Sequence, residues 1–208
     1  MYTHSKETQS QLTPELAFDI LKEGNQRFVK NLKANRDLLK QVNETKEGQF
    51  PFATILSCMD SRTSAELVFD QGLGDIFSIR IAGNVLNEDI LGSMEFATKV
   101  VGTKILLVLG HTRCGAIVGA CNGVQLGHLT GVLARVHPAI EAEAKEGHTG
   151  DGKDREFVNR ITERNVRLTM ERIYNESPVI RELVDAGAVK IAGGVYAVET
   201  GEVTFFED

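Results

Sequence analysis

Residues 53–62, ATILSCMDSR, combine a predicted buried strand with a group of reactive side chains. The apolar run 53–56 is typical of a strand that is covered on both faces. Cys58, Asp60 and Arg62 follow it at every second position. If the extended conformation continues through them, all three side chains lie on the same side of the chain. Taken singly, such a cysteine is most often a small core residue, and an Asp-x-Arg sequence is most often a surface pair.

A second apolar run, residues 105–109, ends in the same manner, with His111 and Cys114 just beyond it. The two strand ends together offer two thiols, an imidazole and a carboxylate, which favours a functional cluster over unrelated residues. Cys114 also begins a predicted helix, residues 114–121, and the N-terminus of a helix favours the thiolate over the thiol.

The remaining segments alternate between predicted helices and predicted strands. Thr13 and Pro14 mark a helix start, as N-cap and first helical residue, and Asn87 is expected to cap another helix. Helices are expected at residues 14–31, 64–71, 89–101, 114–121, 129–144, 154–174 and 179–186. Strands are expected at residues 53–56, 76–81, 104–109, 189–197 and 203–206. This alternation predicts an α/β fold with a mainly parallel central sheet of four to five strands covered by helices, in which sites gather at the carboxyl ends of strands.

The chain is expected to form a single domain, because no linker long enough to separate two domains interrupts its 208 residues. Residues 1–48 are predicted to be an N-terminal helical arm, and residues 49–208 an α/β core that carries the site. Within the arm, residues 33–48 are dominated by polar residues and predict a solvated connection that can hold one further turn of helix.

Charge and cysteine content exclude several classes of protein. With 29 acidic and 23 basic residues the net charge is -6, so neither a nucleic-acid partner nor an anionic membrane is expected. The longest apolar runs are far shorter than the ~20 residues that span a bilayer. Three cysteines are too few for a disulfide framework in a chain of this length, which favours a reduced, cytoplasmic setting. The first twelve residues lack the apolar centre of a secretory signal, although a periplasmic location stays open if a signal has been removed.

A metal site is the most economical explanation of the two strand ends. Cys58, His111 and Cys114 supply two thiolates and an imidazole, a set that suits zinc and leaves a fourth tetrahedral position for water. A purely structural zinc site would need a fourth ligand, but Cys121 falls two helical turns beyond Cys114 and is expected in the core.

Other binding sites are disfavoured by spacing. No Cys-x-x-Cys occurs, which argues against a redox site. Gly72-x-Gly74 follows a predicted helix and not a strand, which argues against a dinucleotide site. His128, His137 and His148 have no ligand partners at matching spacing and are expected to be surface or packing residues.

Three motifs together resemble the β-class carbonic anhydrases: CMDSR at 58–62, RIAGN at 80–84 and GHTRCG at 110–115. The resemblance covers about residues 14–206. It implies a mainly parallel α/β fold, a homodimer or homotetramer, one Zn²⁺ per subunit, and the interconversion of carbon dioxide and bicarbonate. In this family the N-terminal helix typically embraces the neighbouring subunit, which would explain the apolar stripe expected on residues 14–31.

The same resemblance assigns roles to individual residues. Cys58, His111 and Cys114 would be the zinc ligands, and Asp60 and Arg62 the catalytic dyad. Gln49 matches an amide that reaches the substrate pocket from the neighbouring subunit in plant-like members. Phe77, Phe96 and Gly115 would also line the pocket, although Phe96 stands where the family usually has tyrosine.

The chemistry of such a site leads to a prediction about pH. Zinc would lower the pKa of its water enough to form hydroxide, which would attack carbon dioxide. Two thiolates neutralise the formal charge of the metal, so the activity is expected to rise toward basic pH. Arg62 would keep Asp60 ionised by charge pairing and orient it to accept the proton of the hydroxide.

The residue three positions before Cys58 indicates the subtype within this family. Members regulated by bicarbonate carry a tryptophan three residues before the first zinc cysteine, whereas this chain has Ile55 there. We therefore expect an open site without a bicarbonate switch, and not the closed form in which Asp60 itself binds the metal.

Two alternative functions remain open at this point. The same zinc centre could hydrolyse carbonyl sulfide or carbon disulfide, because related proteins differ mainly in access to the pocket. The chain could also be a zinc-holding structural or regulatory protein, although a structural site needs neither Asp60 nor Arg62.

Overall fold

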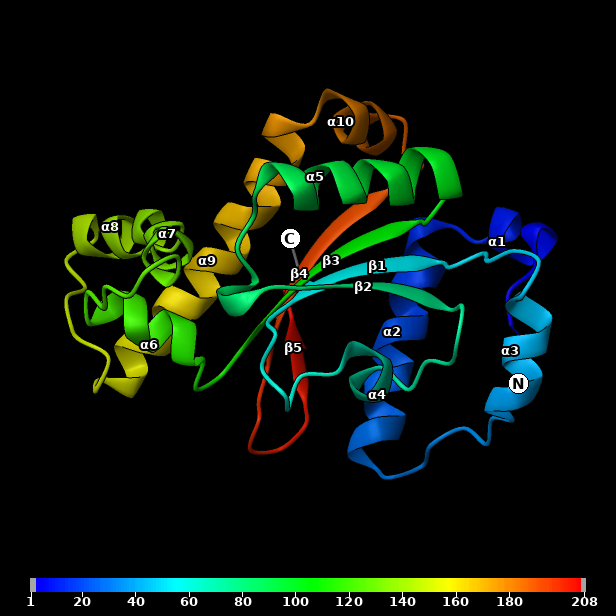
Figure 1. Ribbon diagram of the computed structural model, residues 1–208, viewed down its shortest axis with the longest axis horizontal. Coiled ribbons are helices and arrows are strands. Elements are labelled where there is room, and N and C mark those ends of the chain that lie inside the picture. Colours follow the sequence, from blue (N-terminus) through cyan, green and yellow to red (C-terminus); the bar gives the residue numbers. More distant parts are fainter. Residues whose placement is uncertain (1–2, 207–208) are drawn as a thin grey trace.

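The computed structural model describes residues 3–206, and its centre is a five-stranded sheet with helices on both faces (Figure 1). The strands are β1 (Ala53–Ser57), β2 (Ile76–Arg80), β3 (Ile105–His111), β4 (Lys190–Tyr196) and β5 (Val203–Phe205). Their order is β2-β1-β3-β4-β5; the first four are parallel, and β5 is antiparallel to β4. The predicted fold class, a mainly parallel sheet of four to five strands covered by helices, is confirmed.

The two apolar runs form central, neighbouring strands of this sheet. Every residue of β1 and of β3 is buried, as expected for strands covered on both faces. Ser57 pairs in register with Leu109, so the carboxyl ends of the two strands lie side by side. This pairing brings the segments that follow β1 and β3 to one edge of the sheet.

Alternate strand residues pack against different helices. On one face, Ile55 and Leu107 belong to a core that includes side chains of α2 (Pro14–Val29) and α4 (Ala65–Val68). On the other face, Leu56 and Val108 pack in a core with residues of three helices. These helices are α5 (Glu88–Glu95), α9 (Arg155–Glu176) and α10 (Pro178–Asp185).

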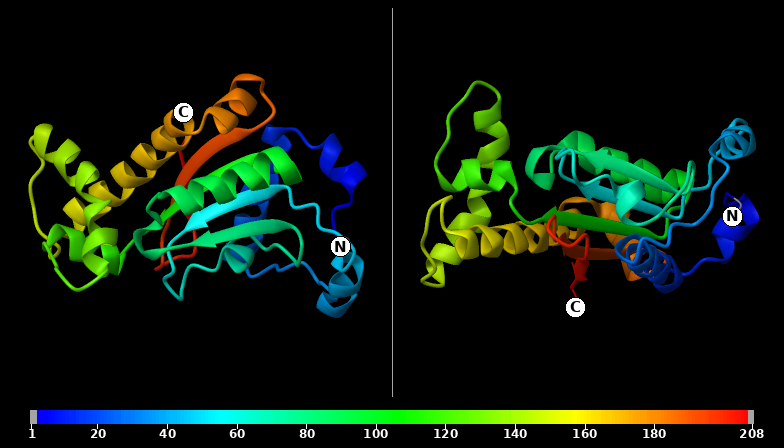
Figure 2. Two further views of the ribbon diagram at one scale, coloured as in Figure 1. Left: turned by 45° about the horizontal axis from the view of Figure 1, so that its top comes forward. Right: turned by 90° about the horizontal axis from the view of Figure 1, so that it is seen from below.

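The remaining helices gather at the two ends of the sheet. The group α6 (Gly115–Cys121), α7 (Leu129–Ala134) and α8 (His137–Lys145) lies beyond the carboxyl ends of the strands, and α1 (Lys6–Gln11) and α3 (Leu38–Thr45) lie at the opposite end (Figure 1). The long helix α9 runs from the α6–α8 group along the sheet (Figure 2). Because α8 and α9 pack together, the group at the carboxyl end is tied to the body of the fold.

Both helix starts expected from capping residues are confirmed. The Thr13 hydroxyl accepts a hydrogen bond from the Leu16 amide at 3.2 Å, and the Asn87 side chain accepts one from the Ile90 amide at 2.9 Å. Each bond satisfies an amide that lacks a partner within its own helix.

The helices differ from the predictions at five places. Residues 33–48 contain the two-turn helix α3, capped by Asp37, and α1 was not expected at all. The predicted helix 129–144 is divided into α7 and α8, because Pro138 lacks an amide hydrogen and fits only the first turn of a new helix. The helix expected at 64–71 is only one turn long, and α5 continues as a π-helix, Phe96–Val101.

The apolar stripe of the N-terminal arm is covered only in part by the chain's own sheet. Ala17, Phe18 and Leu21 of α2 are buried in the same core as β1 and β3. Leu16 and Leu32, at the two ends of the stripe, are 51% and 63% exposed, so the expected contact with a neighbouring subunit stays a prediction. The segment that follows α2 is fixed to the core by Asp70, which accepts hydrogen bonds from Arg27 at 2.6 Å and Arg36 at 2.5 Å.

Candidate metal centre

Cys58, His111 and Cys114 meet at the carboxyl edge of the sheet. Cys58 directly follows β1, His111 is the last residue of β3, and Cys114 precedes α6. All three are buried, and their ligand atoms lie within 4.8 Å of one another. The two sulfur atoms are 3.9 Å apart. In a tetrahedral zinc site with Zn–S bonds of about 2.3 Å, two sulfurs lie about 3.8 Å apart, so the geometry fits that metal.

The imidazole of His111 is oriented for metal binding. Its Nδ1 lies 2.9 Å from the carbonyl oxygen of Thr112. Because a carbonyl can only accept, Nδ1 carries the proton and Nε2 carries the free lone pair. Among the described residues, no hydrogen-bond partner reaches Nε2, although it is buried. A buried acceptor without a partner is costly, and a metal ion would satisfy it.

The two thiols contact one another, and this contact shifts their pKa values in opposite directions. The hydrogen bond from Cys114, together with that from the Gly83 amide, outweighs burial and lowers the pKa of Cys58 below its ordinary value. The same contact and burial raise the pKa of Cys114 above its ordinary value. The lowered pKa favours the thiolate form of Cys58, which is the form that binds metal.

Asp60 and Arg62 face one another at the surface beside this cluster. Arg62 donates from Nε to Oδ1 at 2.9 Å and from Nη2 to Oδ2 at 2.8 Å, and its amide also donates to Oδ1. These hydrogen bonds outweigh partial burial and hold the pKa of Asp60 well below its ordinary range. The carboxylate is therefore ionised and fixed in orientation.

The chain does not stay extended through these residues, which corrects the conditional prediction from the sequence. β1 ends at Ser57, and the backbone then turns, so that Cys58 points into the buried cluster while Asp60 is half-buried and Arg62 is exposed. The turn is held from both sides, because the Thr63 hydroxyl and the Arg80 guanidinium each donate to the carbonyl oxygens of Cys58 and Asp60. Sequence reasoning assigned no role to Thr63 or to the Arg80 side chain.

Of the residues expected to line the substrate pocket, only Gly115 lies next to the cluster in this chain. Gly115 is the first residue of α6, and a side chain added there would meet no atom within 4 Å. Gln49 is exposed and precedes β1, and Phe77 pairs with Thr54 near the start of β1. Both thus lie toward the amino ends of the strands, away from Cys58. Phe96 is 53% exposed at the start of the π-helix.

Glu199 is a further residue near the site that sequence reasoning missed. Its carboxylate contacts Thr112 and Arg113, the two residues between His111 and Cys114. The hydrogen bond from Thr112, and to a lesser degree that from Arg113, lowers the pKa of Glu199. Because Thr112 and Glu199 are 87 positions apart, no spacing pattern in the sequence could have joined them.

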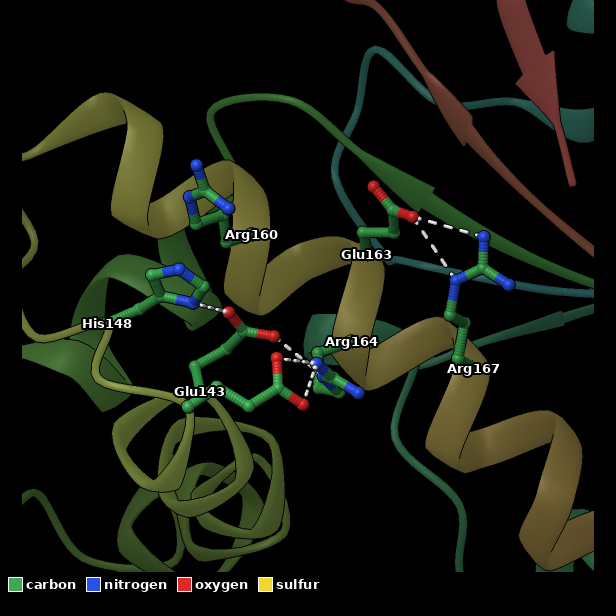
Figure 3. Close-up of a pocket in the computed structure, with 7 residues that line it drawn as sticks. Glu143, His148, Arg160, Glu163, Arg164 and Arg167 are labelled. Carbon is green, nitrogen blue, oxygen red and sulfur yellow. Dashed lines mark hydrogen bonds and ion pairs between the residues drawn. The ribbon is translucent and has the colours of Figure 1, made fainter.

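A second charged cluster lies between α8 and α9, around a cavity of about 230 Å³ (Figure 3). Glu143, Glu146 and His148 bring their ligand atoms within 4.8 Å of one another. Arg164 already bonds both carboxylates, at 2.6 Å to Glu143 and 2.7 Å to Glu146, and His148 lies 2.9 Å from Glu143. The cationic position is thus filled by a guanidinium, and the cluster links the two helices.

Cys121 lies outside both clusters. Its side chain is partly buried against the core around Cys114, and burial raises the pKa of its thiol to about 11. It is therefore an uncharged packing residue, which agrees with the prediction that it belongs to the core.

Comparison with known proteins places this arrangement in one family. Residues 53–203 match the family model described as carbonic anhydrase. Carbonic anhydrase 2 of Mycobacterium tuberculosis is 36% identical over 194 residues, which cover 90% of each chain. A carbonic anhydrase of Mycolicibacterium smegmatis is 33% identical over 197 residues, covering 91% of this chain and 92% of that protein.

Solved structures share the fold at lower identity. A chain from the crystal structures of two tetrameric β-carbonic anhydrases of Sordaria macrospora matches with a TM-score of 0.73 and 23% identity, over 80% of this chain and 85% of the other. The Coccomyxa β-carbonic anhydrase in complex with acetazolamide matches with a TM-score of 0.73 and 22% identity, over 88% of this chain and 83% of that one. In the part of the chain that the structure describes, no helix has the length and apolar character to cross a bilayer.

Proposed function

This chain belongs to the β-class carbonic anhydrase family, and we propose on that basis that it catalyses the zinc-dependent, reversible hydration of carbon dioxide to bicarbonate and a proton. The observation that carries the proposal is the buried set Cys58, His111 and Cys114, whose one unpartnered nitrogen faces two close sulfur atoms. An ionised carboxylate held by an arginine, Asp60, follows Cys58 by two residues.

Cys58, His111 and Cys114 would hold the metal through Sγ, Nε2 and Sγ. When bound, zinc supplies the acidification of water that hydration of carbon dioxide requires near neutral pH. The chain contributes Cys58, whose pKa is lowered by its contact with Cys114, and an imidazole whose tautomer is fixed by the Thr112 carbonyl. These two features reduce the loss of protons and the reorientation of side chains that binding of the ion requires.

Asp60 would orient the attacking water by accepting a hydrogen bond from it at a carboxylate oxygen. An acceptor is needed in that role, and Asp60 can be only an acceptor because Arg62 keeps it ionised. The orientation places an oxygen lone pair toward the substrate carbon. Arg62 acts as a positioning residue, since its two nitrogens fix both carboxylate oxygens.

The open arrangement belongs to the same proposal. Both Asp60 oxygens are engaged by Arg62, and the group of close ligand atoms contains Cys58, His111 and Cys114 without Asp60. This supports a site in which the fourth metal position is left for water, as Ile55 indicated from the sequence.

A homo-oligomer is the proposed working form. Gln49 and Phe77 lie toward the amino ends of the strands, so they could line a substrate pocket only in a neighbouring subunit. Gln49, Phe77 and Phe96 are accordingly proposed as residues that a second copy supplies, with Gly115 leaving open space on the first. The structural neighbours of Sordaria macrospora are described as tetrameric, which agrees with a dimer or tetramer here.

The test of this function is stopped-flow hydration of carbon dioxide by protein of known zinc content. Turnover that needs both zinc and Asp60 supports the enzyme. Stoichiometric zinc without hydration would redirect the proposal to sulfur analogues such as carbonyl sulfide, and then to a structural role.

A further inference from the structure

Glu199 contacts both residues that separate the ligands His111 and Cys114. It lies in the turn between β4 and β5, and its Oε2 accepts a hydrogen bond from the Thr112 hydroxyl at 2.8 Å. Its Oε1 lies 2.5 Å from Nε of Arg113. One carboxylate thus bridges the loop between two proposed metal ligands from outside that loop.

Thr112 is held at three further points. Its amide donates to the Tyr196 carbonyl at 2.9 Å, and its hydroxyl accepts from the Val198 amide at 3.0 Å. Its carbonyl accepts from Nδ1 of His111 at 2.9 Å. The direction of this carbonyl decides which nitrogen of the His111 imidazole carries the proton.

The backbone at Arg113 is strained in a way that needs support. Its φ of 55° lies in the left-handed region, which is unfavourable for residues with a side chain. The peptide that joins Thr112 to Arg113 carries the carbonyl that orients His111. Glu199 binds the side chains on both sides of this peptide, so it opposes relaxation of the strained torsion.

We infer that Glu199 is a positioning residue, which holds the peptide between Thr112 and Arg113 so that His111 keeps its proton on Nδ1 and its free lone pair on Nε2. That this orientation helps to hold zinc rests on the proposed function. The orientation of His111 is a property of the metal-free chain and can be measured without catalysis.

A plain surface ion pair is the alternative role for Glu199. Its side chain is 42% exposed and that of Arg113 is 51% exposed, and exposed pairs often have little effect. Arg113 and Glu199 line a cavity of about 230 Å³ together with Lys153 and Arg155. Glu199 therefore has other cations nearby with which it could pair. The distinction therefore rests on Thr112, because a surface pair would leave His111 unchanged when Glu199 is removed.

The test uses Glu199→Ala, Glu199→Gln and Thr112→Val, with Glu202→Ala as the control. Glu202 is an exposed acid of the same β4–β5 connection. Among the contacts of the described residues, none joins its side chain to Thr112 or Arg113. In zinc-free protein, imidazole nitrogen NMR shifts report the tautomer of His111. In zinc-loaded protein, transfer of the metal to a chelator reports how firmly the site holds it.

The wild type and Glu202→Ala are expected to show a single Nδ1–H tautomer and slow zinc release. Glu199→Ala and Thr112→Val should populate the other tautomer and release zinc about 10-fold faster, which is the usual effect of losing a residue that orients a ligand. Glu199→Gln should recover most of the tautomer preference, because its amide oxygen can still accept from Thr112.

Wild-type tautomer and wild-type zinc release in Glu199→Ala would overturn the inference, whatever the hydration activity. If Glu199→Ala does not fold, Thr112→Val decides in the same way, because it removes one hydroxyl and keeps the shape of the side chain. The two proposals fail separately. Wild-type tautomer and zinc release in the variants would refute the role of Glu199, and absence of hydration by the zinc-loaded wild type would refute the proposed function.

Discussion

The carboxylate of Asp60 and the guanidinium of Arg62 form a two-pronged pair, with both oxygens engaged at 2.9 and 2.8 Å. The pair lies at the surface, directly after the buried Cys58. Such a pair fixes the direction of the carboxylate as well as its charge. Asp60 is therefore prepared to orient a small reactant beside the cysteine–histidine cluster.

Replacing Asp60 by asparagine should separate catalysis from metal binding. We expect kcat/KM for hydration to fall by about 10²-fold or more, because the amide can donate where the carboxylate could only accept. Zinc content should be unchanged, since Asp60 is not part of the close group of ligand atoms. Hydration kinetics and metal analysis of one preparation check both statements. Asp89→Asn, an exposed acid on α5, is the control, and full activity in Asp60→Asn would exclude the assigned role.

Removing one thiol should remove the metal. Cys58→Ser is expected to bring zinc well below one ion per chain, because a hydroxyl is a poor ligand for zinc and only two strong ligands remain. Cys121→Ser is the matched control: its thiol lies outside the cluster and should leave the zinc content unchanged. Metal analysis after dialysis checks this, and equal zinc loss in both variants would contradict the assignment.

The fold and the ligand set were predictable from the sequence because they depend on local patterns. Two apolar runs identified β1 and β3, and parallel pairing of those strands places Cys58 near His111 without further information. Capping residues such as Thr13 identified a helix start for the same reason. These features need only a few neighbouring residues to be recognised.

What the sequence could not predict depends on distant contacts or on competing local preferences. Glu199 reaches Thr112 only because β4 lies beside β3, and Arg164 reaches Glu143 only because α9 packs on α8. In α3 the apolar residues Leu38, Leu39 and Val42 are exposed and only Gln41 is buried, so the helix does not follow from burial of an apolar face in this chain. The π-helix after α5 has no sequence signature of its own.

Asp70 should make stability depend on pH at the acid end. Burial opposes its charged form, but hydrogen bonds from Arg27 and Arg36 outweigh it and lower the pKa of Asp70 below its ordinary 3.8. A lowered pKa contributes stability above the unfolded-state pKa, and this contribution is lost as the pH falls through the folded-state value. Asp70→Asn should therefore be less stable than wild type by a constant amount from about pH 8 to 5, and by a shrinking amount below about pH 4.

Urea unfolding at several pH values measures this difference. Asparagine suits the left-handed backbone at position 70, where φ is 46°, so the variant tests charge and not strain. A difference that grows as the pH falls would contradict the assignment of Asp70.

Glu143 should contribute to stability through Arg164 and His148. Its side chain is only 6% exposed, and the ion pairs keep its pKa below the ordinary value in spite of burial. Glu143→Gln should lower the free energy of unfolding by about 2 kcal/mol, because it removes the buried one of the two carboxylates that pair with Arg164 and leaves that guanidinium only the exposed Glu146. Glu156→Gln removes an exposed pair with Arg160 and should cause no measurable change. Thermal unfolding of both variants compares them, and equal effects would show that burial of Glu143 is unimportant.

The central claim is tested most directly by stopped-flow hydration of carbon dioxide from about pH 6.5 to 9, on protein whose zinc content is measured before and after chelation. Turnover is expected to rise with pH, because two thiolate ligands leave the metal a weaker acidifier of water than three imidazoles would. It should vanish when zinc is removed and return when zinc is restored. Stoichiometric zinc with no hydration at any pH in this range would contradict the account.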